Sequence, residues 1–393
     1  MLLRFILGFI TGYFAFGWPH PRHLVLSAAV PFVWCVSEKR KHAASYIFGY
    51  YLAAARGIPA GSTVFFSYPN MLYGFLMLLT SSTILTLVWY IFFLPKNNRA
   101  FIPLFTRLLL VFIFITIPPV GIIGWASPLL SVGFLLPETG FYGIFLFLAA
   151  VTVISIEHIR AEKKRTSASI LTAYILFAFL FAPDTPMKPA GWQAIDTHFG
   201  RSASGSAVSR SLKPFYTILP EIEKSSAQYI LLPETFFFFW SPEVKGEIQP
   251  ILDRLHKRAQ TIVVGAAIYD QRREKYDNCL IFLSGREEKR YKQRIPVPLS
   301  MWRPFAIDGA NAYPWSKGIL SIKSTETVSL ICYEQFLAWP MLRSMSGYPR
   351  PEILIAAANQ WWCKKTCIPN IQNQSAASWA MLFKIPLITA ANK

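Results

Sequence analysis

The sequence predicts a multi-pass α-helical membrane domain followed by an α/β domain outside the cytoplasm. Of its 393 residues, 53% are hydrophobic and the mean hydropathy is +0.36, which is too apolar for one soluble domain. Charge in residues 1–185 is confined to short runs between apolar stretches, whereas in residues 186–393 it is scattered as on a soluble surface. We therefore place the boundary near residues 183–186, where two prolines end a helical run.

Seven apolar stretches precede that boundary and are predicted to form about seven transmembrane helices. A spanning helix needs about 20 apolar residues, with a lower limit near 17, so the shorter stretches have uncertain ends. We expect the first stretch to be a span rather than a signal peptide, because no small-residue cleavage site follows it. The stretches are roughly 2–18, 23–36, 43–57, 70–94, 107–124, 140–157 and 168–183.

The loops between these stretches predict the orientation of the chain. Basic residues follow the second, fourth and sixth stretches, whereas loops 58–69 and 125–139 contain no Lys or Arg. Basic loops stay in the cytoplasm, so the loop after the sixth stretch is expected there. A seventh span then carries the chain across the membrane, and the second domain is expected on the periplasmic side of a bacterial inner membrane. This pattern explains much of the net charge of +18, and we expect no direct nucleic-acid binding. The basic residues of these loops are Lys39, Arg40, Lys41, Lys96, Arg99, Arg160, Lys163, Lys164 and Arg165, and Arg4 near the N-terminus is expected on the same side.

Residues 186–393 alternate between strand-like and helix-like segments, which favours an α/β sandwich. We expect the segments 319–322 and 327–331 to pair as neighbouring strands. The predicted strands are 191–195, 228–233, 261–269, 276–283, 319–322, 327–331, 352–357 and 385–390, and the predicted helices are 206–226, 242–259 and 370–384.

Three residues at the ends of strand-like runs are candidate catalytic groups: Glu234, Lys292 and Cys332. A thiol nucleophile needs a base to take its proton and a cation to hold the developing oxyanion, and these side chains supply both. Each has an ordinary alternative reading when taken alone. Glu234 could be a strand-end carboxylate, Lys292 a residue of a solvated charged run, and Cys332 a small core hydrophobe.

The remaining cysteines give weaker signals. Cys363 and Cys367 could form a disulfide outside the cytoplasm or remain two thiols, whereas Cys35 and Cys279 read as core residues. No His or further Cys lies near the 363–367 segment to complete a zinc site. We therefore expect neither a metal nor another cofactor.

Three motifs resemble the carbon–nitrogen hydrolase (nitrilase) superfamily in the chain order Glu, Lys, Cys. They are Leu232-Pro233-Glu234-Thr235, Tyr291-Lys292 and Ile331-Cys332-Tyr333-Glu334. Within the superfamily the layout resembles apolipoprotein N-acyltransferase, and the shorter, basic chain is most similar to conjugal transfer proteins of the TraB type. The resemblance implies an αββα sandwich for the second domain.

The resemblance also implies a role for each residue. Cys332 would attack a phospholipid acyl ester to form a thioester, Glu234 would be the general base, and Lys292 would stabilise the oxyanion. Tyr333 and Glu334 would support the site. The acyl group would then pass to an amine, such as a lipoprotein N-terminus, and conjugal transfer components would be possible partners.

Several departures from the family leave a second hypothesis open. The segment 297–301 lacks the glutamate that the family carries after its lysine, Gln360 replaces an aspartate, and the chain ends at Lys393, so the domain is expected to be shortened at its C-terminus. The alternative is an envelope or conjugation factor that keeps the fold for binding or assembly with little or no catalysis.

Overall fold

The computed structural model describes the whole chain except residues 68–70, 96–98, 161–164, 182–184, 201–204 and 271–273. The predicted boundary at 183–186 and the predicted basic residues Lys96, Lys163 and Lys164 therefore lie wholly or partly outside the described residues. The chain divides into two compact units. One comprises residues 1–186, 336–339 and 365–384, and the other comprises residues 187–335, 340–364 and 385–393.

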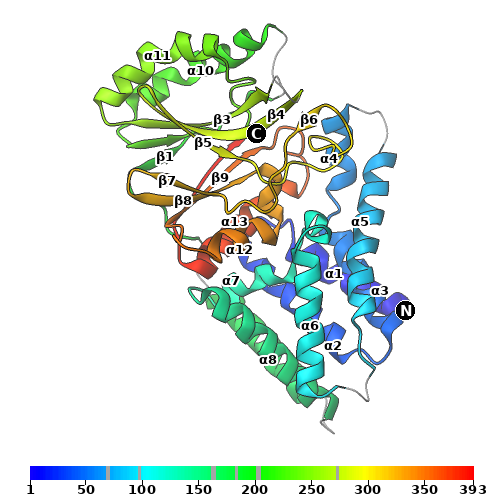
Figure 1. Cartoon of the computed structure of the whole chain (residues 1–393). Coiled ribbons are helices and arrows are strands. Elements are labelled where there is room, and N and C mark those ends of the chain that lie inside the picture. Colours follow the sequence, from blue (N-terminus) through cyan, green and yellow to red (C-terminus); the bar gives the residue numbers. More distant parts are fainter. Residues whose placement is uncertain (68–70, 96–98, 161–164, 182–184, 201–204, 271–273) are drawn as a thin grey trace. The chain divides into compact units, whose positions relative to one another are not determined.

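The first unit is helical, and a helix overlaps the described part of each of the seven predicted apolar stretches (Figure 1). The additional helix α4 occupies a segment that we expected to be a loop, where Pro59 suits a first helical turn. In chain order the elements are α1 (Leu2–Ala15), η1 (Pro21–Ala28), α2 (Ala29–Val36), α3 (Arg40–Ala54), α4 (Ile58–Phe66), α5 (Leu72–Ile91), α6 (Phe101–Thr116), η3 (Val120–Ile123), η4 (Pro128–Ser131), α7 (Val132–Leu135), α8 (Gly140–Arg160) and α9 (Arg165–Phe181).

Two of the described helices, α5 and α8, are long and apolar enough to cross a membrane by length and composition. Shorter apolar helices cover residues 2–15, 21–36, 101–116 and 172–181. Since a full span needs about 20 residues, the multi-pass domain with about seven spans remains a prediction.

The second unit is an α/β structure with two sheets, as the alternating pattern predicted. Its elements are β1 (Trp192–Ala194), α10 (Ala207–Lys224), β2 (Tyr229–Leu231), α11 (Pro242–Lys257), β3 (Thr261–Asp270), β4 (Lys275–Ser284), β5 (Glu287–Lys292), β6 (Gly309–Ala310), β7 (Ile319–Ile322), β8 (Thr325–Ile331), η5 (Cys332–Phe336), α12 (Ala338–Met345), β9 (Ile353–Asn359) and β10 (Leu387–Asn392), of which η5 and α12 also include residues of the first unit.

One sheet has the order β1-β2-β3-β4-β5, with β6 pairing beside β4, and the other has the order β10-β9-β8-β7. The expected pairing of the segments 319–322 and 327–331 is confirmed as the antiparallel β7–β8 pair. Strands β8, β9 and β10 run parallel, so β8 and β9 carry Cys332 and Asn359 to the same edge of their sheet.

Two apolar layers hold this unit together. The first lies between α10, α11 and one face of the β1–β5 sheet, and it includes Phe215, Ile248 and Cys279. The second lies between the two sheets and includes Leu231, Tyr291 and Ile388. Figure 1 shows α10 and α11 on the outer face of the β1–β5 sheet, so the order of layers is helix, sheet, sheet.

The predicted helix 370–384 is α13 (Ile368–Phe383), and it belongs to the first compact unit. There the Ser378 hydroxyl donates a 2.5 Å hydrogen bond to the Leu130 carbonyl. A side chain at Gly133 would collide with the Ser378 backbone, so this close approach needs glycine. The helix is where the sequence placed it, but it packs with the N-terminal helices.

Candidate active site

Glu234 follows β2 and is almost completely buried, with 3% of its surface exposed. Its backbone lies against β3, where a Cβ on Gly265 would collide with the backbones of Pro233, Glu234 and Thr235. The Phe237 amide then donates to the Gly265 carbonyl at 3.0 Å. The missing side chain at Gly265 thus allows the turn after β2 to lie on the sheet and direct Glu234 inward.

Cys332 follows β8 directly and begins the short helix η5. Its φ of 47° lies in the left-handed region, which costs a non-glycine residue about 1 kcal/mol or more. The residue is buried, and its neighbours Ile331 and Ala357 belong to the layer between the two sheets. A strained turn at a strand end is a common setting for a nucleophile, because it presents one side chain away from the sheet.

The structure brings Glu234 and Cys332 together. Their side chains are hydrogen-bonded, and the Asn359 amide donates to Glu234 Oε2 at 3.0 Å. Burial raises the pKa of Glu234 to about 7, although hydrogen bonds from Cys332, Asn278 and Asn359 oppose the rise. Burial, and then the negative charge of Glu234, raises the pKa of the Cys332 thiol well above its usual value. The resting pair is therefore a thiol that donates to a carboxylate able to act as a base near pH 7.

Lys292 has a different set of contacts. Its Nζ lies 2.6 Å from Asp277 Oδ2, and 48% of its side-chain surface is exposed. The hydrogen bond to Asp277 raises the pKa of Lys292, and Tyr313 Oη also donates to Asp277 at 2.8 Å. Among the described contacts, the lysine is thus the counter-ion of Asp277, and its expected role at the oxyanion remains a prediction.

Tyr333 and Glu334 follow Cys332 in the chain, and both are buried. The Glu334 carboxylate accepts hydrogen bonds from the amides of Ile331 at 2.8 Å and Arg294 at 2.6 Å, and from the Tyr291 hydroxyl at 3.1 Å. Burial raises the pKa of Glu334, although the buried Arg294 guanidinium opposes the rise. Glu334 therefore ties the turn around Cys332 to the chain that leaves β5. The supporting roles of both residues remain predictions.

Three polar residues around the pair were absent from the sequence prediction: Asn278, Gln293 and Asn359. Asn278 Nδ2 donates to Glu234 Oε1 at 2.7 Å and to Gln293 Oε1 at 2.9 Å. Asn359 Oδ1 accepts from Asn392 Nδ2 at 3.0 Å, which holds the end of β9 beside β10. The sequence could have indicated Gln293. It lies two residues after the apolar Tyr291, and residues two apart in a strand lie on the same face.

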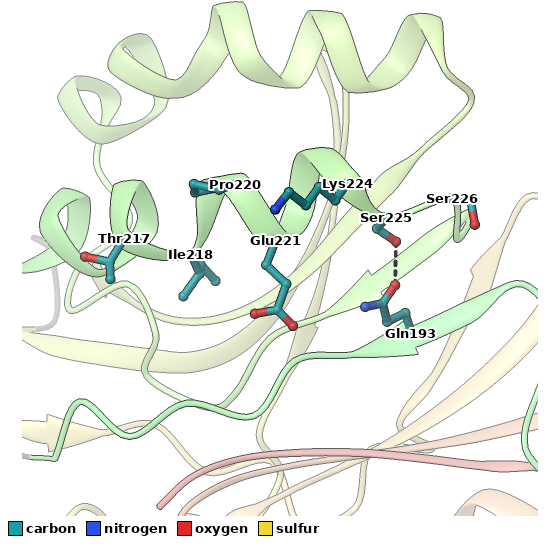
Figure 2. Close-up of a pocket in the computed structure, with 8 residues that line it drawn as sticks. All are labelled: Gln193, Thr217, Ile218, Pro220, Glu221, Lys224, Ser225 and Ser226. Atoms are coloured by element: carbon teal, nitrogen blue, oxygen red, sulfur yellow. Dashed lines mark hydrogen bonds between the residues drawn. The ribbon is translucent and has the colours of Figure 1, made fainter.

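Other candidate sites carry less chemistry. No disulfide joins Cys363 to Cys367, and no group of three or more His, Cys, Asp or Glu side chains among the described residues could hold a metal ion. A hollow of about 500 Å³ lies beside α10 and is lined by Gln193, Glu221 and Lys224 among others. Figure 2 shows these side chains. None of its lining residues belongs to the Glu234–Cys332 site, so the hollow is separate from the candidate chemistry.

No model of a protein family matches the chain. Among solved structures, the chain is similar to an amidase of the nitrilase superfamily from Nesterenkonia sp. AN1, with 14% identity, a TM-score of 0.35, and coverage of 54% of this chain and 79% of the amidase. It is also similar to an N-terminal amidase, with 11% identity, a TM-score of 0.30, and coverage of 43% and 47%.

Two curated relatives are similar over nearly their whole length. The chain is 29% identical to a probable conjugal transfer protein TraB of Sinorhizobium fredii, covering 94% of this chain and 92% of that protein. It is also 29% identical to the conjugal transfer protein TraB of Agrobacterium fabrum, covering 96% and 90%. The predicted resemblance to conjugal transfer proteins of the TraB type is therefore confirmed.

Proposed function

We propose that this protein is a membrane-bound acyltransferase of the carbon–nitrogen hydrolase type that works in conjugal transfer. The observation that carries the proposal is the buried Glu234 carboxylate, hydrogen-bonded to the Cys332 thiol at a strained strand end. A base with a pKa near the working pH beside a thiol is the arrangement that covalent acyl transfer needs.

In the first half-reaction, Cys332 Sγ attacks the carbonyl carbon of a phospholipid acyl ester while Glu234 takes the thiol proton. The tetrahedral intermediate collapses with cleavage of the ester C–O bond. Glu234 returns the proton to the leaving oxygen, so a lysophospholipid departs and a thioester remains on Cys332. Because the thiol is buried and its pKa is raised, proton transfer has to accompany the attack rather than precede it.

In the second half-reaction, an amine attacks the thioester carbonyl. Glu234 takes a proton from the amine as the C–S bond breaks, and the cysteine leaves as a thiolate that is reprotonated. The product is an amide. The proposed acceptor class is a primary amine such as a lipoprotein N-terminus, and the proposed donor is a lipid of the bilayer in which the N-terminal unit is anchored.

Exposed apolar side chains on the two longest apolar helices support the membrane part of the proposal. Leu76 and Leu87 on α5 and Phe145 and Leu146 on α8 each expose about half of their surface. Large exposed apolar surfaces mark contacts with lipid or protein. Together with the charge pattern of the loops, they favour an inner-membrane protein with its second unit on the periplasmic side.

The contacts of Lys292 favour a second candidate function. Lys292, the residue expected to stabilise the oxyanion, is paired with Asp277. This observation favours a conjugation or envelope factor that retains the fold for binding or assembly and has little catalysis.

Intact-mass measurement separates the two candidates. The protein is purified in detergent, incubated with phosphatidylethanolamine, and compared with the Cys332→Ala variant. The acyltransferase proposal expects a mass increase of one acyl chain that hydroxylamine removes and that the variant lacks. A folded wild-type protein that gains no adduct would favour the non-catalytic role.

A further inference from the structure

The two faces of the β1–β5 sheet separate Lys292 from the polar groups around Glu234. In the antiparallel β4–β5 pair, Lys292 lies opposite Cys279 and Tyr291 lies opposite Leu280. Cys279 belongs to the layer under α10 and α11, whereas Leu280 and Tyr291 belong to the layer between the two sheets. Paired residues share a face, so Lys292 lies on the helix-covered face, as does its partner Asp277.

Gln293, the next residue, belongs to the opposite face and is almost completely buried, with 1% of its surface exposed. Its backbone amide donates to the Asn278 carbonyl at 2.7 Å. Its side-chain Nε2 donates to the Ile331 carbonyl at 2.9 Å, and its Oε1 accepts from Asn278 Nδ2 at 2.9 Å. The same Asn278 amide group donates to Glu234 Oε1.

These bonds form one continuous chain from the base to the nucleophile. It runs from the Glu234 carboxylate through the Asn278 amide and the Gln293 amide to the carbonyl of Ile331, the residue before Cys332. Every polar group in this chain is buried, where a lost hydrogen bond leaves its partner unsatisfied. Such a network fixes the geometry of the groups at its two ends.

We propose that Gln293, and not Lys292, is the residue from the end of β5 that serves the Glu234–Cys332 pair. It acts as a positioning residue, holding the base through Asn278 and the nucleophile turn through Ile331. Lys292 is instead the counter-ion of Asp277. The inference rests on the proposed thiol chemistry of the site. It implies that the residue at the end of β5 that contacts the site network carries a neutral amide rather than a cation.

The test measures the alkylation rate of Cys332 by iodoacetamide between pH 5.5 and 9.5, by peptide mass spectrometry on the full-length detergent-purified protein. Gln293→Met keeps the side-chain length and removes both hydrogen bonds, and we expect it to lower the rate at pH 7.5 by about tenfold to a hundredfold, the range for a displaced catalytic group. The matched control Lys292→Met should stay within about twofold of wild type, because the lysine faces the other side of the sheet. The Glu234→Gln variant gives the alkylation rate of Cys332 in the absence of its proposed base.

A second substitution at the same position tests the inference by introducing a positive charge. Gln293→Lys places a cation in the buried network, and it should shift the Cys332 profile to lower pH by about one unit or more. If Gln293→Met does not fold, as judged by its thermal unfolding, Asn278→Leu interrupts the same chain from the other side and should also slow alkylation. The inference is overturned if Lys292→Met slows alkylation as much as Glu234→Gln while Gln293→Met or Asn278→Leu reacts like wild type.

Alkylation requires no phospholipid, so this test can contradict the positioning role of Gln293 without bearing on the proposed lipid substrate, which the acyl-adduct test examines. A Gln293-dependent Cys332 profile without an acyl adduct would leave the positioning role standing and remove the proposed lipid substrate. An acyl adduct that depends on Lys292 but not on Gln293 would support the proposed lipid substrate and remove the positioning role of Gln293.

Discussion

The reactivity of Cys332 should follow the ionisation of one carboxyl group. Burial raises the pKa of Glu234 to about 7, so the carboxylate is protonated below that pH and cannot accept the thiol proton. We expect the alkylation rate of Cys332 to rise with an apparent pKa near 7 and then to level off, until the thiol itself ionises at much higher pH. In Glu234→Gln the step near pH 7 should disappear. An unchanged profile in this variant would show that another group is the base.

Glu334 illustrates a different use of a buried charge. Its carboxylate and the Arg294 guanidinium are both inaccessible to water, with Nε 3.4 Å from Oε1. Glu334→Gln keeps the shape and leaves Arg294 as an unpaired buried charge, which costs about 3–5 kcal/mol of the free energy of unfolding. The exposed pair Arg303–Asp308 offers a control, because Asp308→Asn should cost about 1 kcal/mol or less. Unfolding midpoints of the two variants test this, and equal midpoints would contradict it.

Among single residues, the sequence indicated those that follow distinctive apolar runs. It gave no indication of residues whose hydrogen-bond partners lie on another strand. Glu234 and Cys332 each end an apolar run, and the structure brings their side chains together. Asn278 and Gln293 are 15 residues apart, and their contact depends on the register of two strands. Amide side chains also carry no charge pattern that would mark them, so only the alternation after Tyr291 could have indicated Gln293.

Strand β5 shows why element types are harder to predict at a sheet edge. Its sequence, Glu287–Lys292, reads as a solvated charged run, yet it pairs with β4 along six residues. It is the last strand in the order β1-β2-β3-β4-β5, and edge strands commonly carry charged residues that discourage pairing with other chains. The apolar strands β3, β4 and β8 were predicted to within two residues because both of their faces are largely buried.

Gly265 allows a test of how β3 positions the base. A methyl group there would collide with the backbone around Glu234, so Gly265→Ala should displace the turn after β2. We expect Cys332 alkylation at pH 7.5 to fall by about tenfold or more, as for other small misplacements of a catalytic group. The measurement is the same peptide-mapped alkylation rate.

Gly246 in α11 is the matched control for this substitution. Nothing lies within 4 Å of a Cβ built at this position, and alanine favours a helix interior over glycine by about 0.5–1 kcal/mol. Gly246→Ala should therefore keep the alkylation rate and raise the unfolding midpoint slightly. Equal alkylation rates for the Gly246 and Gly265 variants would contradict the role given to β3.

For the whole molecule, the two parts of the sequence were predicted with different success. Alternation of strands and helices depends on local patterns, and the two-sheet α/β unit follows it closely. Assignment of α13 to the N-terminal unit depends on packing between segments such as Leu130 and Ser378, which are 248 residues apart. The number of membrane spans depends on helix length against bilayer thickness, and several of the helices are shorter than a full span.

The charge pattern predicts the orientation of the whole chain, and a pair of reporter fusions tests it. Green fluorescent protein placed before Met1 should fluoresce, because Arg4 and the basic loops predict a cytoplasmic N-terminus. Alkaline phosphatase placed after Lys393 should be active, because the odd number of predicted spans would carry the second unit to the periplasm. A fluorescent fusion at Lys393 with inactive phosphatase would place the Glu234–Cys332 site in the cytoplasm. In that compartment, a periplasmic lipoprotein N-terminus could not be the acceptor, so the same result would remove the acceptor from the proposed reaction.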